Sequence, residues 1–254
     1  MDKNNFIQLN KIKSFKKQNF WTKNSIFHFR YFLFIGLLYF CLNSCGTTEK
    51  ASVYKPGRVW EFDVTVQDSS GIVVDSFQLN MKTRNSNVAE KAIRQITVEY
   101  EYLKNGKSFD TETTGIEDNT ERIHIHPPRD SYFDVSEIVH FPFISKPFGR
   151  GFKTSTEMVI QKASFINRKT NEKIDLAGKR IKQEVALVDS TTIVFKNKEL
   201  KCYVIEGKNL NNIKELGQFS CKFYFNKKYG LVKFIYTTPW KSTIVANLKS
   251  VDFK

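Results

Sequence analysis

The stretch that decides the fold is Trp60-Glu61-Phe62-Asp63-Val64-Thr65-Val66-Gln67. Large apolar side chains alternate in it with polar ones, at the period of two residues that a strand with one buried face requires. The turn-forming pair Pro56-Gly57 precedes it, and Asp68-Ser69-Ser70-Gly71 follows it and favours a reversal of the chain. One dry and one wet face are typical of antiparallel sheets. We therefore predict that this strand opens an antiparallel β-domain.

The same alternation recurs along the chain. Asn105-Gly106 follows the alternating segment at residues 96–102 and predicts a two-residue hairpin turn. Both central residues of a type I′ turn have positive φ, which Asn and Gly adopt most readily. Strands are expected at residues 77–82, 96–102, 109–113, 123–126, 154–165, 179–189, 191–195, 201–206, 218–225, 231–236 and 242–252. We predict an all-β, mainly antiparallel fold of roughly ten strands with little helix: a twisted sheet, a half-barrel or a sandwich.

Residues 127–152 interrupt this rhythm. Six prolines and glycines exclude a central strand there: Pro127, Pro128, Pro142, Pro147, Gly149 and Gly151. We expect a long irregular crossover with a short helical turn near residues 134–139. Residues 147–152 (PFGRGF) echo residues 56–60 (PGRVW), so residues 56–254 are either one β-rich domain or two half-sheets joined by the crossover.

An aromatic run accompanies these prolines. Its members either plug the open end of a sheet, which we favour, or line the mouth of an apolar cavity: Phe141, Phe143, Phe148 and Phe152.

The first 44 residues predict a secretion signal. Residues 1–30 are basic, and residues 31–42 (YFLFIGLLYFCL) form an apolar run of 12 residues. A membrane-spanning helix needs about 20 apolar residues, so this run is too short to cross a bilayer. It matches the hydrophobic core of a cleaved signal peptide. An uncleaved signal anchor is the alternative.

Residues 42–45 (Leu-Asn-Ser-Cys) resemble the bacterial lipobox, in which an aliphatic and a small residue precede the acceptor cysteine. The Cys45 thiol would accept a diacylglyceryl group, and two or three acyl chains give stable anchoring where one is marginal. Cys41 is a poorer acceptor, because bulky aromatic residues precede it. Gly46 replaces the Asp that retains lipoproteins at the inner membrane, so we expect the periplasmic face of the outer membrane. Residues 45–55 would be the lipidated N-terminus and tether.

The chain is basic. Its 40 Lys and Arg and 26 Asp and Glu give a formal charge of +14. Residues 1–44 hold seven of the basic residues and one acidic residue, which leaves +8 for the remainder. A basic body can lie against anionic lipid headgroups or nucleic acid. Export excludes nucleic acid, and dispersed lysines on the wet faces of strands explain most of the surplus.

Two cysteines remain after the leader, and export places them in an oxidising compartment. If the strands at 201–206 and 218–225 form a hairpin with Cys202 facing Cys221, the two Cα atoms lie within the range that a disulfide tolerates. The sequence predicts this disulfide, and two buried free thiols are the alternative. A catalytic or metal-binding cysteine is not favoured, because no His lies near either one in the sequence.

The sharpest candidate for chemistry is His124-Ile125-His126. Residues i and i+2 share one face of a strand, so both imidazoles could reach one metal ion. Further ligands would come from His140, Asp130 or Asp134. We favour the alternative, in which the two histidines lie on a wet face and the neighbouring isoleucines point into the core. No metalloprotease, nucleophile-elbow or phosphate-loop motif occurs, and no cofactor is expected.

Short motifs near both ends of the body resemble uncharacterised envelope lipoproteins of the Bacteroidota type. They are Gly57-Arg58-Val59-Trp60, Lys201-Cys202-Tyr203-Val204-Ile205, Tyr224-Phe225 and Tyr229-Gly230-Leu231-Val232. The family's Val-Pro-Ala-Gly turn before the second motif is replaced here by Phe195–Lys198. The resemblance covers most of residues 56–254 and implies a twisted antiparallel sheet or half-barrel similar to lipoprotein carriers. It implies no catalytic residue.

These features predict a lipid-anchored protein of the cell envelope. We expect a non-catalytic binding or structural module for an apolar ligand or an envelope partner, attached to the membrane through Cys45. An envelope hydrolase with a site near His124 and His126 is the alternative.

Overall fold

A computed structural model describes residues 52–85, 95–129, 132–133, 136, 143–149, 151–160, 164–167, 172–211 and 217–253. The chain divides into two units, Met1–Thr48 and Glu49–Lys254, and every described residue belongs to the second. The predicted signal peptide and residues 45–51, which include Cys45, lie outside the described residues. So do other residues of the sequence analysis: Asp130, Asp134, His140, Phe141 and Pro142.

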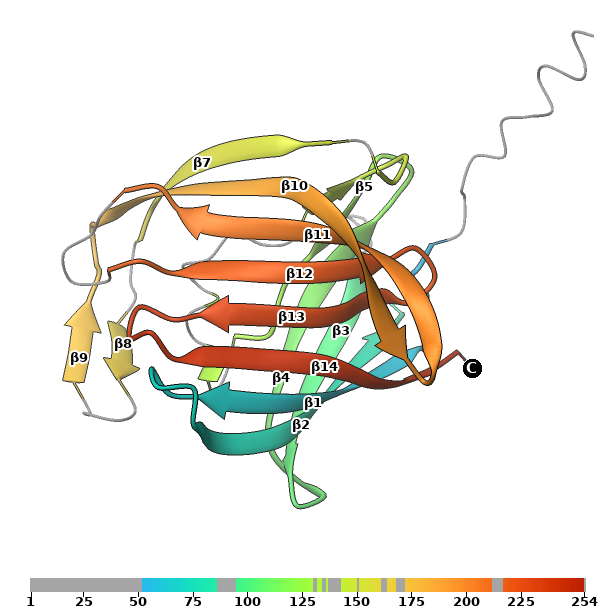
Figure 1. The fold of residues 1–254 in the computed structure, drawn as a ribbon, viewed down its shortest axis with the longest axis horizontal. Helices are drawn as coiled ribbons and strands as arrows, with labels where there is room; N and C mark the ends of the chain where they lie inside the picture. The colour runs from blue at the N-terminus through green and yellow to red at the C-terminus, as the bar shows by residue number, and fades with distance from the viewer. Residues whose placement is uncertain are drawn as a thin grey trace, which may run out of the picture. The chain divides into compact units, whose positions relative to one another are not determined.

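The described residues form fourteen β-strands, of which twelve belong to one antiparallel sheet (Figure 1). The strands are β1 (Val59–Gln67), β2 (Val73–Arg84), β3 (Ile96–Lys104), β4 (Lys107–Asp118), β5 (Arg122–Ile125), β6 (Phe143–Ser145), β7 (Lys153–Val159), β8 (Ser164–Asn167), β9 (Glu172–Asp175), β10 (Arg180–Phe195), β11 (Lys198–Asn209), β12 (Ser220–Asn226), β13 (Gly230–Thr237) and β14 (Thr243–Asp252). β8 and β9 form a separate hairpin. The predicted all-β, antiparallel fold is confirmed.

The two halves of the chain meet in the middle of the large sheet. Its order is β6-β5-β4-β3-β2-β1-β14-β13-β12-β11-β10-β7, so the first and last strands of the chain are neighbours. The sheet is therefore continuous, and the edge strands β6 and β7 do not pair with each other. It curls, so that β3 and β4 pass behind β11 to β14 in Figure 1.

The strand that opens the domain has the predicted faces. Trp60, Phe62, Val64 and Val66 of β1 are all buried, while the residues between them are partly or fully exposed. The predicted hairpin turn joins β3 to β4, and Asn105 and Gly106 both have positive φ, of 52° and 73°. Local alternation and turn chemistry therefore decide these elements.

Two predicted boundaries are wrong. The predicted strands at 179–189 and 191–195 form one continuous strand, β10. A bulge at Val188 accommodates one extra residue opposite β11, so the strand continues without a break. The predicted strand at 154–165 is divided between β7 and β8. The crossover contains the edge strand β6, flanked by prolines as edge strands allow.

The inner face of the curled sheet is packed with aromatic rings. Phe133, which lies with Tyr132 in a short 3₁₀ turn of the crossover, is fully buried. Its ring lies about 6 Å from four rings of β2, β3 and β13: Phe77, Tyr102, Phe234 and Tyr236. The crossover thus covers part of the inner face with a side chain of its own.

Candidate functional site

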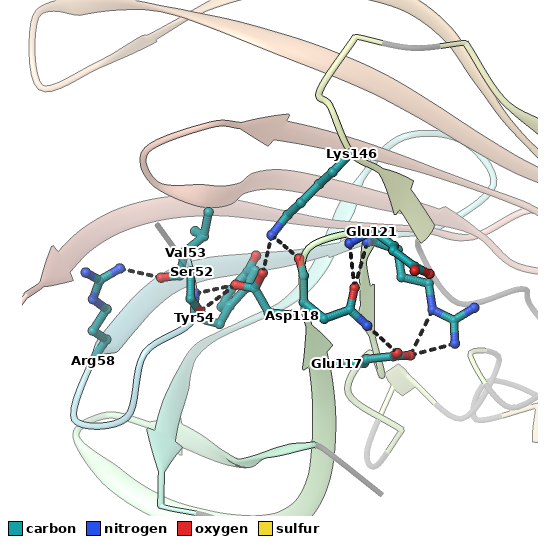
Figure 2. A network of polar contacts seen from close by, with 10 residues as sticks. Ser52, Val53, Tyr54, Arg58, Glu117, Asp118, Glu121 and Lys146 are labelled. Atoms are coloured by element: carbon teal, nitrogen blue, oxygen red, sulfur yellow. Dashed lines mark hydrogen bonds and ion pairs between the residues drawn. The ribbon is translucent and has the colours of Figure 1, made fainter. Parts of the chain in front are cut away.

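The chain enters the sheet through a polar network built on Asp118 at the end of β4 (Figure 2). Ser52 Oγ donates a hydrogen bond of 2.8 Å to Asp118 Oδ2, and the backbone N–H of Tyr54 donates one of 3.1 Å to the same oxygen. Both residues lie in the last part of the predicted tether, residues 45–55. We call this contact, together with Lys146 on the other side of Asp118, the anchor clamp.

Lys146 completes the anchor clamp from the residue after β6. Its Nζ lies 2.7 Å from Asp118 Oδ1 and donates a second hydrogen bond, of 2.6 Å, to the carbonyl oxygen of Asn119. The side chain of Asp118 is 0% exposed and that of Lys146 is 6% exposed. A buried charge is tolerated only when it is paired and hydrogen-bonded, and both carboxylate oxygens here have partners.

Tyr54 fastens the same segment to the other half of the sheet. Its side chain is fully buried against the ring of Trp60, and its hydroxyl oxygen accepts a hydrogen bond of 2.9 Å from the N–H of Leu231 in β13. Trp60 Nε1 donates to the carbonyl oxygen of Tyr229. Burial raises the pKa of Tyr54 well above its usual value, so the hydroxyl stays protonated.

The turn between β4 and β5 holds Asp118 in place. The Oδ1 atom of Asn119 accepts hydrogen bonds from the backbone N–H groups of Glu121 and Arg122. The guanidinium of Arg122 pairs with Glu117 at 2.8 Å. An Asx turn of this kind fixes the backbone locally, and it begins at the residue directly after Asp118.

The anchor clamp is suited to holding a chain segment in place. Each oxygen of Asp118 already accepts hydrogen bonds, and Lys146 is committed to two oxygens. The sequence analysis missed this site. The only local signal was the Asp-Asn-Thr turn at 118–120, and nothing local connects it to a lysine 28 residues later.

The two candidate histidines lie side by side, as predicted. The ring centroids of His124 and His126 are 5.2 Å apart, and Ile123 and Ile125 of the same strand are buried. His126 Nδ1 lies 3.1 Å from Nη2 of Arg129, and because a guanidinium can only donate, Nδ1 accepts. Within the described part of the chain, no group of three or more His, Cys, Asp or Glu is placed to hold a metal ion.

The environment of His126 favours the neutral ring. Burial, followed by the charges of the neighbouring His124 and Arg129, lowers its pKa to about 4. A group with so low a pKa is a weak general base at neutral pH. His126 is therefore poorly suited to act as a general base.

The predicted disulfide is wrong, because the register of β11 and β12 differs from the predicted one. Cys221 lies opposite Gly207, and both cysteines are buried free thiols. Cys202 is five residues from Gly207 along β11, a distance of about 16 Å. Because five is an odd number of residues, the side chain of Cys202 lies on the opposite face of the sheet from Gly207 and Cys221. The Cys221 thiol occupies the space that a side chain at Gly207 would fill.

The described aromatic residues of the crossover pack against the sheet and each other. Phe148 lies 5.3 Å from Phe225 of β12, and Phe143 lies 5.2 Å from Phe152.

No helix among the residues described is both long and apolar enough to span a bilayer.

Comparison with known proteins gives similarity to solved structures alone. No protein-family model and no curated protein matches the chain. A candidate lipoprotein from Parabacteroides distasonis is 11% identical with a TM-score of 0.42, over 78% of this chain and 96% of that one. A candidate exported protein with a YmcC-like fold from Bacteroides fragilis is 8% identical with a TM-score of 0.41, over 80% and 100%.

The hypothetical lipoprotein YmcC from Escherichia coli is 6% identical with a TM-score of 0.33, over 77% of this chain and 87% of that one. The descriptions of these three proteins name a lipoprotein or an exported protein.

Proposed function

We propose that this chain is a lipid-anchored, non-catalytic module of the cell envelope that binds an apolar ligand or an envelope partner. The observation that carries the proposal is that the anchor clamp and a group of exposed apolar side chains lie at opposite ends of the sheet. At one end the anchor clamp fastens Ser52 and Tyr54, seven and nine residues after the predicted acylation site Cys45. At the other end apolar side chains face solvent.

The exposed apolar side chains lie where the β1–β2 and β3–β4 turns end. They are 64%, 53%, 57% and 49% exposed in the order Ile72, Val73, Val74 and Phe109, and we call them the apolar rim. The ring of Phe109 lies 6.0 Å from that of Phe77, so the rim continues into the aromatic inner face. Exposed apolar side chains that gather at one end of a domain are candidates for a binding site. A ligand with an acyl chain, or an apolar surface of another envelope protein, has the matching chemistry.

The anchor is tested first. We expect the mature N-terminus to begin at Cys45 and to carry the mass of a diacylglyceryl group and a further acyl chain. The Cys45→Ala variant should accumulate as an unprocessed precursor. A mature protein without any acyl mass would contradict the anchor. If the acylated protein is found in the outer-membrane fraction and is protected from protease in intact cells, this would support the periplasmic face.

Binding at the apolar rim is tested by native mass spectrometry of the mature protein and by chemical cross-linking in cells. We expect a bound lipid or a cross-linked envelope protein, and we expect Val73→Asp with Phe109→Ser to remove it. Val188→Asp, at an exposed apolar position of the β10 bulge, is the matched control. Equal binding by both variants would contradict a role for the rim.

A further inference from the structure

A row of aromatic rings crosses the end of the sheet that carries the anchor clamp. Phe195, at the end of β10, lies 5.5 Å from Tyr229, which precedes β13. Tyr229 in turn stacks at 5.8 Å on Phe253, which follows β14. The row therefore joins three segments that are far apart in the sequence, and all three lie on the side of Figure 1 where the C-terminus is marked.

Each ring of this row has a cation over its face. Lys196 lies 5.6 Å from the centroid of Phe195, Lys228 lies 5.2 Å from that of Tyr229, and Arg58 lies 4.8 Å from that of Phe253. Arg58 also donates a hydrogen bond to the carbonyl oxygen of Val53, so the row reaches the segment held by the anchor clamp. An aromatic ring with a Lys or Arg cation over its face combines an apolar surface with a positive charge, which suits the boundary between membrane and water.

This end of the sheet, which we call the basic end, has a surplus of positive charge. Six cations lie in the segment before β1, in the β10–β11 and β12–β13 turns and at the start of β11: Lys55, Arg58, Lys196, Lys198, Lys227 and Lys228. The strand residues beside them add two carboxylates, Glu199 and Asp252. The β4–β5 turn at the same end adds Glu121, while Asp118 and Glu117 there are paired with Lys146 and Arg122.

Three lysines of the basic end have no carboxylate partner within the described part of the chain. Several other lysines of the sheet do pair with carboxylates, as Lys104 does with Asp75 and Lys222 does with Glu206. Among the residues described, Lys196, Lys198 and Lys228 form no salt bridge. Their charge is therefore available to an external anion.

The predicted tether keeps the basic end near the bilayer. Ser52 follows Cys45 by seven residues, and a fully extended chain of that length spans at most about 25 Å. β1 then runs away from this end for nine residues, which is about 30 Å. Of the two ends of the sheet, the basic one is thus tied to the acylated residue by the shorter path.

We propose that the basic end docks on the anionic phospholipid headgroups of the membrane that holds the anchor, and so orients the sheet with its apolar rim away from the bilayer. The proposal rests on the anchor proposed above. Phosphate groups of the lipid would neutralise the unpaired lysines, and the aromatic row would lie at the level of the headgroups.

The test uses the mature acylated protein in vesicles of phosphatidylcholine, with or without phosphatidylglycerol. An amine-reactive reagent labels the lysines, and peptide mass spectrometry gives the rate at each one. We expect Lys196, Lys198 and Lys228 to label about fivefold more slowly in the anionic vesicles and to recover at high salt. Lys107 and Lys241, in the turns at the other end, should label equally in both.

Charge reversal gives a matched pair of variants. K196E/K198E should restore the labelling of Lys228 in anionic vesicles, whereas K107E/K241E should leave its protection unchanged. Equal labelling of the basic end in neutral and anionic vesicles would overturn the docking surface while leaving the anchor intact. Protein that floats with neither kind of vesicle would overturn the anchor and the docking surface together.

Discussion

His126 is a titratable residue that the fold holds in its neutral form. Its pKa is lowered from 6.5 to about 4, first by burial and then by His124 and Arg129. The folded state therefore binds this proton less tightly than the unfolded state does, so stability is present above the unfolded pKa and is lost as the pH falls towards 4.

We predict that the free energy of unfolding falls by about 1–2 kcal/mol from pH 7 to pH 5 through this residue, after allowance for its partly exposed ring. Urea unfolding at the two pH values measures it. The dependence should flatten in His126→Asn and largely persist in His124→Asn, because burial is the main cause. An unchanged slope in His126→Asn would show that another group is responsible.

Gly207 is required by the thiol opposite it. A Cβ atom at this position would lie 2.6 Å from Cys221 Sγ, closer than two such atoms approach. We predict that Gly207→Ala costs about 1–3 kcal/mol of unfolding free energy, and that Cys221→Ala relieves part of the cost when the two are combined. Gly151→Ala, where a Cβ meets nothing within 4 Å, is the control. Strict additivity of the pair would refute the steric explanation.

At the scale of elements, the anchor clamp ties the segment before β1 to the end of β4 and the end of β6. Asp118→Ala leaves the ammonium of Lys146 buried without its counter-charge, so we predict a loss of about 3–5 kcal/mol. Lys146→Met in the same chain should recover part of it. Lys104→Ala, which breaks the more exposed pair with Asp75, should cost about 1 kcal/mol or less.

Hydrogen exchange separates a local effect from a global one in these variants. The N–H of Tyr54 donates to Asp118, so in Asp118→Ala it should exchange faster than the amides of β12 and β13. A uniform increase over the whole sheet would show that the clamp stabilises the domain without fixing this segment.

At the scale of the whole molecule, Phe133 connects the crossover to both halves of the sheet. Its ring packs between Phe77 of β2 and Tyr236 of β13. We predict that Phe133→Ala costs about 3–5 kcal/mol and leaves an apolar cavity that binds a small aromatic molecule such as benzene. Thermal unfolding with and without benzene measures both. A variant as stable as the natural chain would show that the crossover does not contribute to the core.

The control for this prediction is the neighbouring ring. Tyr132 is only partly buried, and its hydroxyl donates to Asp75, so Tyr132→Ala should cost less and should not respond to benzene.

The sequence by itself determined the elements and their class. Alternation in β1 and the turn at Asn105-Gly106 act between residues that are adjacent in the chain, so they can be interpreted without a structure. The buried isoleucines beside His124 follow the same rule. The apolar run at 31–42 and the cysteine after it depend likewise on local composition alone, which is why the anchor is a prediction from sequence.

Only the tertiary structure decided which residues meet. Both faces of β11 are buried near Cys202, Val204 and Ile205, so alternation does not select a register there, and Cys221 pairs with Gly207 instead of the predicted partner. The partnership of Asp118 with Lys146 and the row from Phe195 to Phe253 depend on chain crossings that no local pattern records. Contacts between distant segments are set by how the whole sheet curls and closes its core, and this is a property of all its strands together.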